Sequence, residues 1–130
     1  MVVDSSAVVG ILLDESEAEK LATALLGEPR RFMSSLTALE TAMVIEARKG
    51  PNGAREWDLL AMELELEFVP FTTAQTTLAL EAWRRYGNGR HKASLNIGDC
   101  CSYALAVHLG EPLLFKGDDF SRTDIVPVPW

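Results

Sequence analysis

The sequence has little cysteine and histidine, and the few it has do not form a recognisable metal or disulfide pattern. Cys100 and Cys101 are adjacent, which is poor geometry for a disulfide, and they make no C-x-x-C motif. His91 and His108 have no metal-ligand spacing relative to them. We therefore expect buried free thiols in a reducing compartment, and neither a disulfide-stapled scaffold nor a zinc site.

Long apolar runs and a surplus of basic residues are missing as well. No segment approaches the ~18 consecutive apolar residues of a membrane span, and Asp4 interrupts an N-terminal run that lacks a basic region, which argues against a signal peptide. The net charge of −7, from 12 Lys and Arg against 19 Asp and Glu, argues against a surface built for non-specific nucleic-acid binding. A nuclease whose clustered carboxylates are neutralised by cations remains compatible with it. We expect a cytoplasmic protein that does not contact membranes.

What the sequence has is an alternation of strands and helices. With 130 residues, 48% hydrophobic and 24% charged, it suits one folded domain over residues 1–130, without repeats or linkers. The expected helices cover about residues 7–13, 17–26, 35–49, 54–66, 73–86 and 96–109. The expected strands cover residues 1–3, 31–33, 68–71, 112–116 and 124–128. This order predicts an α/β domain with a central parallel sheet of about four to five strands and helices on both faces.

The opening residues contain the first candidate site residue. The apolar run Met1-Val2-Val3 predicts a short buried strand, and it ends at Asp4. In open α/β sheets, ligands bind at the carboxyl ends of the strands, so Asp4 is placed for function. The alternative is that Asp4, or one of the two serines after it, only caps the following helix.

A second carboxylate interrupts the apolar face of the helix expected at residues 35–49. Glu40 is separated by helical spacings from Leu36, Met43 and Val44, so it shares or borders their face. Burying an unpaired carboxylate costs several kcal/mol, which suggests a purpose. The alternative is a boundary residue whose head group reaches water.

Three more acids are predicted at the same edge of the sheet. Asp99 lies in the first turn of the helix expected at residues 96–109, where the helix dipole alone would favour it. Asp118 and Asp119 follow the strand expected at residues 112–116, where an ordinary turn is the alternative. Several acids that converge without matching Lys or Arg need a cation, and oxygen ligands favour Mg²⁺ or Mn²⁺.

Together these segments resemble the PIN-domain ribonucleases, specifically the VapC toxins of type II toxin–antitoxin systems. The resemblance is carried by Val-Val-Asp-Ser-Ser-Ala, Ser-Ser-Leu-Thr-Ala-Leu-Glu, Leu-Asn-Ile-Gly-Asp-Cys-Cys and Leu-Leu-Phe-Lys-Gly-Asp-Asp-Phe, in this order over nearly the whole chain. It implies Mg²⁺-dependent hydrolysis of RNA phosphodiester bonds by a catalytic acidic quartet. Asp4 and Asp99 would bind the metal directly, and Glu40 would act through a water.

The resemblance leaves the fourth acid open. The family often has an acid two residues before the final Asp-Phe pair, where this chain has Gly117. Asp118 is the first choice for the fourth catalytic position, and Asp119 is the second. The resemblance also implies a homodimer and a VapB-like antitoxin whose C-terminal arm occupies the acidic site.

Other interpretations follow from the residues themselves. Arg90-His91-Lys92 is the best candidate for contacts with substrate phosphates, but an ordinary solvated loop is the favoured interpretation and the segment is not assigned as a site. A catalytically silent PIN-like binding protein is the alternative function, favoured only by Gly117. A small metal-dependent phosphatase would need an Asp-x-Asp motif after the first strand, which Asp4-Ser5-Ser6 does not supply.

Overall fold

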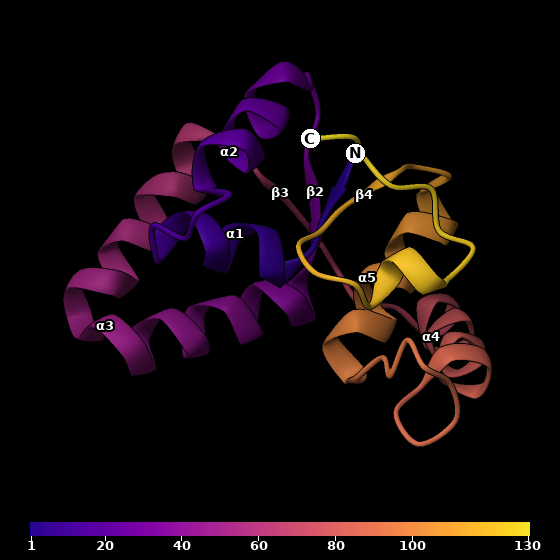
Figure 1. The fold of residues 1–130 in the computed structure, drawn as a ribbon. Helices are drawn as coiled ribbons and strands as arrows, with labels where there is room; N and C mark the ends of the chain where they lie inside the picture. Colours follow the sequence, from indigo (N-terminus) through magenta and orange to yellow (C-terminus); the bar gives the residue numbers. More distant parts are fainter.

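Short strands alternate with helices along the chain in the computed structural model, which describes residues 1–130 (Figure 1). The strands are β1 (Val2–Val3), β2 (Phe32–Ser34), β3 (Glu67–Val69) and β4 (Leu113–Leu114). The helices are α1 (Ser5–Leu12), α2 (Ala18–Gly27), α3 (Ser35–Glu63), α4 (Thr73–Tyr86) and α5 (Ile97–Leu109), and a 3₁₀ turn, η1 (Phe120–Arg122), follows β4. None of the helices has the length and apolar character needed to cross a membrane.

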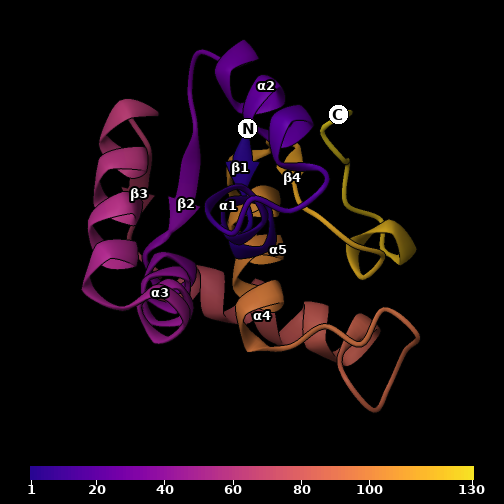
Figure 2. The same cartoon turned by 60° about the vertical axis from the view of Figure 1, so that its left-hand side comes forward.

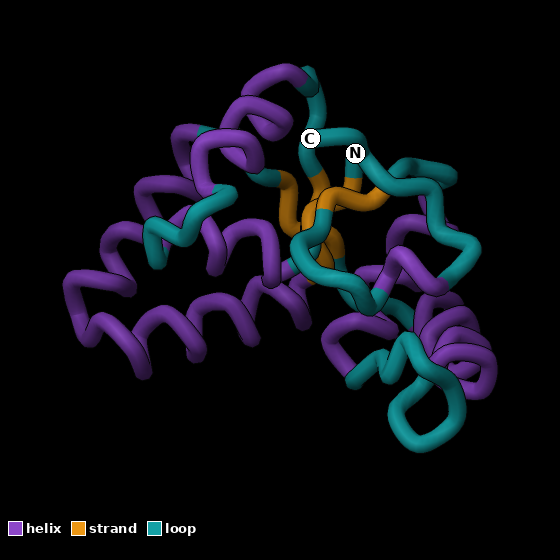
Figure 3. The backbone as a smooth tube through the Cα atoms, in the orientation of Figure 1, coloured by secondary structure: helices purple, strands orange, loops and turns teal.

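The four strands form one sheet in the order β3-β2-β1-β4, at the centre of the molecule (Figure 3). Every neighbouring pair is parallel, with Val2 opposite both Phe32 and Leu113. The carboxyl ends of all strands therefore lie along the same edge. Asp4, the start of α3 and the loop after β4 all leave the sheet there, which gathers residues from distant parts of the chain.

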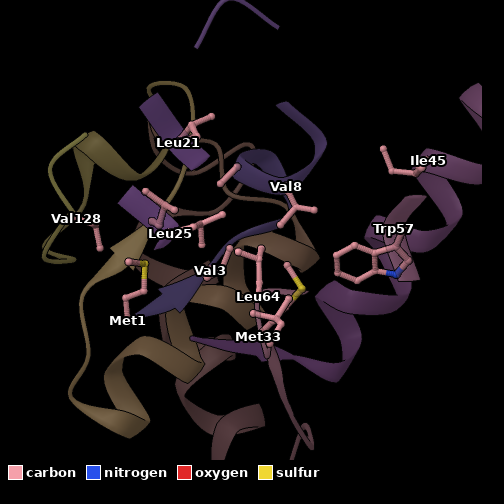
Figure 4. Packing of buried hydrophobic residues seen from close by; sticks show 13 residues of the cluster. Met1, Val3, Val8, Leu21, Leu25, Met33, Ile45, Trp57, Leu64 and Val128 are labelled. Atoms are coloured by element: carbon pink, nitrogen blue, oxygen red, sulfur yellow. The ribbon is translucent and has the colours of Figure 1, made fainter. Parts of the chain in front are cut away.

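Helices cover both faces of the sheet, as predicted: α1, α2 and α3 lie on one side, and α4 and α5 lie on the other (Figures 1 and 2). Alternation along β1 supplies both cores, because Val3 points into the first layer and Val2 into the second. Figure 4 shows the first core, which contains Val3, Val8, Leu21, Leu25, Met33, Ile45, Trp57 and Leu64. The second contains Val2, Phe32, Leu95, Tyr103, Leu105, Leu113, Phe115 and Phe120. The two closely packed hydrophobic cores hold the sheet, and with it the carboxyl edge of its strands, rigidly between them.

Helix α3 unites the two helices that were predicted at residues 35–49 and 54–66. It begins where the Ser34 hydroxyl accepts a hydrogen bond from the Leu36 N–H group. Gly50 interrupts it with φ 64° and ψ −156°, a backbone conformation that favours glycine, and Pro51 opens the second half. The predicted break is therefore confirmed, as a sharp bend within one element (Figure 1).

The strand predicted at residues 124–128 is wrong. The segment makes only an isolated bridge between Pro127 and Leu113, supported by hydrogen bonds of Leu113 with Val126 and Val128. Pro127 and Pro129 have no N–H group to donate, so the pairing cannot extend into a ladder. The sheet thus has four strands, within the predicted range.

Candidate active site

Asp4 is the most deeply buried acid of the carboxyl edge, with an exposed fraction of 1%. Its Oδ2 accepts hydrogen bonds from the backbone N–H (2.9 Å) and the hydroxyl (2.6 Å) of Ser6. Its Oδ1 accepts a hydrogen bond from the Ser102 hydroxyl at 2.6 Å. Ser6 Oγ also accepts from the Lys116 N–H group at 3.0 Å. Asp4 therefore caps α1, and it also joins β1, α5 and the end of β4 in one hydrogen-bonded unit.

Glu40 reaches this edge from the second turn of α3. It is half-buried, and the Ser5 hydroxyl donates a long hydrogen bond of 3.4 Å to its Oε2. Burial raises the pKa of Glu40, and the negative charge of Asp4 raises it further, while the Ser5 hydroxyl acts in the opposite direction. Gly98 at the start of α5 permits the approach, because a Cβ atom there would overlap the Glu40 carboxylate. Glu40 thus faces the other acids, in contrast to the solvated alternative.

Asp99 lies in the first turn of α5 and forms a capping box with Asn96. Its Oδ2 accepts from the Asn96 N–H group at 2.8 Å, and its own N–H donates to Asn96 Oδ1 at 2.9 Å. Burial raises the pKa of Asp99 to about 7, helped by the charges of Asp4, Asp119 and Glu40, although the Asn96 hydrogen bond opposes the shift. The dipole explanation is therefore incomplete, because three other carboxylates act on this one.

Asp118 and Asp119 are both exposed in the loop between β4 and η1, but they differ in their relation to the other acids. The charge of Asp119 is among the largest contributions to the raised pKa of Asp99, and that of Asp118 is not. The backbone carbonyl of Asp118 accepts the Ser121 hydroxyl within its own turn. This effect on Asp99 favours Asp119, the second choice from sequence, over Asp118 as the candidate for the fourth acid.

The chemistry of this donor set fits a hard divalent cation. Asp4, Glu40, Asp99 and Asp119 supply only carboxylate oxygens, and none of them forms an ion pair with a Lys or Arg. Lys116, three residues before Asp119, pairs instead with Glu15 and Glu17. In this structure no three such side chains lie close enough to hold one ion together. Binding of a metal ion would therefore have to bring the carboxylates closer to one another. Because these carboxylates have no cationic partner, their attraction to a divalent ion would favour this closer arrangement.

Two positions of the site were missed from sequence. Ser102 is fully buried and supplies the only hydrogen bond to Asp4 Oδ1, yet in the apolar run of α5 it resembled a small packing residue. Its spacing of three residues from Asp99 could have placed it on the same helix face. The contact of Gly98 with Glu40 has no comparable signal in the sequence. The adjacent Cys100 and Cys101 are buried free thiols, as predicted.

The comparisons with known proteins agree with this arrangement. The family model of the PIN domain matches residues 1–126. Ribonuclease VapC of Mycolicibacterium smegmatis is 51% identical over 128 residues, which cover 98% of this chain and 99% of the relative. Ribonuclease VapC30 of Mycobacterium tuberculosis is 49% identical over 128 residues, which cover 98% of each chain.

Solved structures share the fold at much lower identity. VapC20 of Mycobacterium tuberculosis, described as a sarcin–ricin loop cleaving toxin, superposes with a TM-score of 0.81 at 17% identity, covering 99% of this chain and 98% of its own. VapBC2 of Rickettsia felis, bound to a DNA fragment from its promoter, gives 0.75 at 14% identity, covering 99% and 97%. The fold and the near full-length identity to the mycobacterial proteins lead to one conclusion: the chain belongs to the PIN-domain family and, within it, to the VapC ribonucleases.

Proposed function

We propose that the chain is the toxin of a type II toxin–antitoxin system and hydrolyses RNA phosphodiester bonds with Mg²⁺, which Mn²⁺ can replace. The observation that carries the proposal is the placement of Asp4, Glu40, Asp99 and the loop with Asp119 at one edge of the sheet, where the charges of the other three acids help to raise the pKa of Asp99. Divalent-metal dependence is general among VapC ribonucleases of the PIN family. The choice of Mg²⁺ rests on the all-oxygen donor set.

The acids divide into distinct roles. Asp4 and Asp99 would hold the ion, since both are fixed by hydrogen bonds that leave lone pairs free. Glu40 would orient the attacking water, and its raised pKa suits a group that exchanges a proton with water. A bound divalent ion supplies Lewis acidity, activating a water for in-line attack and stabilising charge on the phosphate. Asp119, on the loop after β4, would complete the site from the exposed side.

Partner binding is proposed from the same edge. A VapB-like antitoxin would place a basic side chain among the unpaired carboxylates, since a cation there satisfies the same charge as a metal. Three large apolar side chains beside Glu40 are exposed, Ile97 by 75%, Met43 by 64% and Leu39 by 61%. A homodimer that covers them would remove this apolar surface from water. Light scattering of wild type and Ile97→Asp would test that dimer, with loss of the dimer expected for the variant.

The test of the activity is cleavage of purified total RNA by protein freed of any antitoxin. With Mg²⁺ or Mn²⁺ we expect discrete fragments, which disappear with EDTA and with Asp99→Asn. Asp118→Asn, which removes an exposed acid from the same loop as Asp119, is the matched control and should still cleave. Intact RNA in every lane from folded protein would contradict the proposal and favour the catalytically silent binding protein.

A further inference from the structure

One stretch of this acidic protein combines four cations with no acid. Residues 82–98, here called the basic segment, include Arg84, Arg85, Arg90 and Lys92, which are four of the 12 Lys and Arg residues of the chain, and neither Asp nor Glu. The segment covers the end of α4, the loop at residues 87–96 and the first turn of α5 (Figure 3). Positive charge is thus concentrated in one place, immediately before Asp99.

Three of the four cations of the basic segment are unpaired, so their N–H groups are available to a ligand. Arg84, Arg90 and Lys92 are exposed, and their side chains form no ion pair and donate no hydrogen bond to the protein. By contrast, Arg30, Lys49 and Lys116 each pair with glutamate, and Arg85 pairs with Asp124. Like charges close together in one segment repel one another, and a bound anion relieves that repulsion.

The loop that presents these cations is braced. Gly87 and Leu95 form a bridge that closes it, and the Arg90 guanidinium packs 4.0 Å from the centre of the Trp83 ring. Packing on an aromatic face leaves the guanidinium N–H groups free at its edge, where a phosphate can accept from two of them. The charge is therefore held in position before a ligand arrives, which reduces the entropy lost on binding.

The basic segment is tied to the acidic site at two points. Asn96, its last polar residue, forms the capping box with Asp99. From the other side, Arg122 of η1 donates a hydrogen bond of 2.9 Å to the Lys92 carbonyl, and η1 directly follows Asp119. The loop with the fourth acid and the loop with the cations are thus joined into one rim. A polyanion lying along this rim would contact the cations of the basic segment and then reach the carboxylates of the acidic site.

We infer that the basic segment binds the phosphate backbone of single-stranded RNA next to the acidic site, through Arg84, Arg90 and Lys92. This inference rests on the proposed ribonuclease function and assigns the residues that hold its substrate. The acids alone repel RNA, so the enzyme needs a cationic surface beside them. Backbone contacts of this kind position the substrate and carry no sequence information.

The test compares two double variants with the same loss of charge. Arg90→Gln/Lys92→Gln removes two cations of the basic segment, and Lys20→Gln/Arg55→Gln removes two exposed, unpaired cations on α2 and α3. Binding is measured by fluorescence anisotropy of a labelled, mixed-sequence single-stranded RNA, with Mg²⁺ and in the Asp99→Asn background so that the RNA survives. We expect about a tenfold or greater rise in Kd for the first pair and less than about twofold for the second. The salt dependence should fall by about 1.4 in log Kd per log salt for the first pair only, at about 0.7 per lost phosphate contact.

The same two double variants, this time with Asp99 retained, are then compared with the wild type in cleavage of total RNA. This experiment separates the inference from the proposed ribonuclease function. For Arg90→Gln/Lys92→Gln we expect a higher KM than for the wild type, with kcat retained. Cleavage by all forms with equal KM, together with equal Kd, would overturn the inference and leave the ribonuclease function intact. A changed oligomeric state of the first pair, with unchanged RNA affinity, would overturn it in favour of a protein interface. Loss of cleavage by the wild type itself is the separate failure of the proposed function.

Discussion

Asp99→Asn should stabilise the folded chain while abolishing its activity. The Asp99 carboxyl group is partly buried at the start of α5, and this burial raises its pKa to about 7, helped by the charges of three other carboxylates. Asparagine keeps the carbonyl oxygen that accepts the Asn96 N–H hydrogen bond, so the capping box loses little. It removes the charge, however, and with it both the cost of burying that charge and the repulsion from the other acids.

The magnitude follows from the shift in pKa between the unfolded and folded chain. In the unfolded chain Asp99 ionises near 3.8, and in the folded chain near 7. The folded state therefore keeps its proton longer, and the free energy of unfolding falls as pH rises from about 4 to about 7. At about 1.36 kcal/mol per pKa unit the full shift corresponds to about 4 kcal/mol. Because Asp99 is only partly buried and water screens part of this energy, we expect ~2–3 kcal/mol.

Urea unfolding without metal, at constant ionic strength, measures the effect. Between pH 4 and pH 8, the free energy of unfolding of Asp99→Asn should rise relative to the wild type by ~2–3 kcal/mol, with Asp118→Asn showing no such gain. Added Mg²⁺ should reverse the order at pH 8, because it stabilises only the form that binds it. A difference between Asp99→Asn and wild type that stays constant over this pH range would refute the argument that clustered, buried charge destabilises the site.

Three further predictions concern the other members of the site. Asp119→Asn should lower the rate of RNA cleavage by at least about tenfold and Asp118→Asn by less than about twofold, which initial rates in Mg²⁺ would distinguish. Gly98→Ala should displace the Glu40 carboxylate and lower kcat, while circular dichroism shows an intact α5; an unchanged kcat would mean that Glu40 has no fixed role. Ser102→Ala leaves one oxygen of the buried Asp4 without its donor and should lower the free energy of unfolding by about 1–3 kcal/mol and the apparent Mg²⁺ affinity, measured by titration of cleavage.

The architecture could be predicted from the sequence because the periodic signals are local. The apolar run of β1 and the helical spacing in α5 indicate their elements directly, and Gly50-Pro51 marks the bend of α3. The terminal segment could not be predicted in this way. Its apolar residues satisfy a strand pattern, but Pro127 and Pro129 deny it the donors of a ladder, and only the chain path beside β4 shows that one bridge is all that forms.

In the acidic site, too, some residues could be predicted from local sequence patterns and others could not. Asp4, Glu40 and Asp99 could be selected because each contradicts or punctuates the local pattern around it. The choice between Asp118 and Asp119 depends on which side chain the turn directs toward Asp99, and neighbouring positions in a turn give no periodic signal. Ser102 was missed for a different reason: a small residue in a buried helix is compatible with packing, and only the distance to Asp4 assigns it.

The start of α5 resolves the apparent conflict between an acidic protein and an anionic substrate. Opposite charges are not mixed along this edge of the chain but separated: the basic segment contains no acid, and the carboxylates of the site have no Lys or Arg partner. If the two sets paired with one another, both would be neutralised and neither would be available to a metal ion or to RNA. Lys116 illustrates how this is avoided, because it forms its ion pairs with Glu15 and Glu17 and not with Asp119. The capping box of Asn96 and Asp99 then fixes the boundary between the two charge regions at a single helix turn. Separation of this kind costs stability, as the raised pKa of Asp99 shows, and a bound cation on one side and a polyanion on the other would both offset that cost.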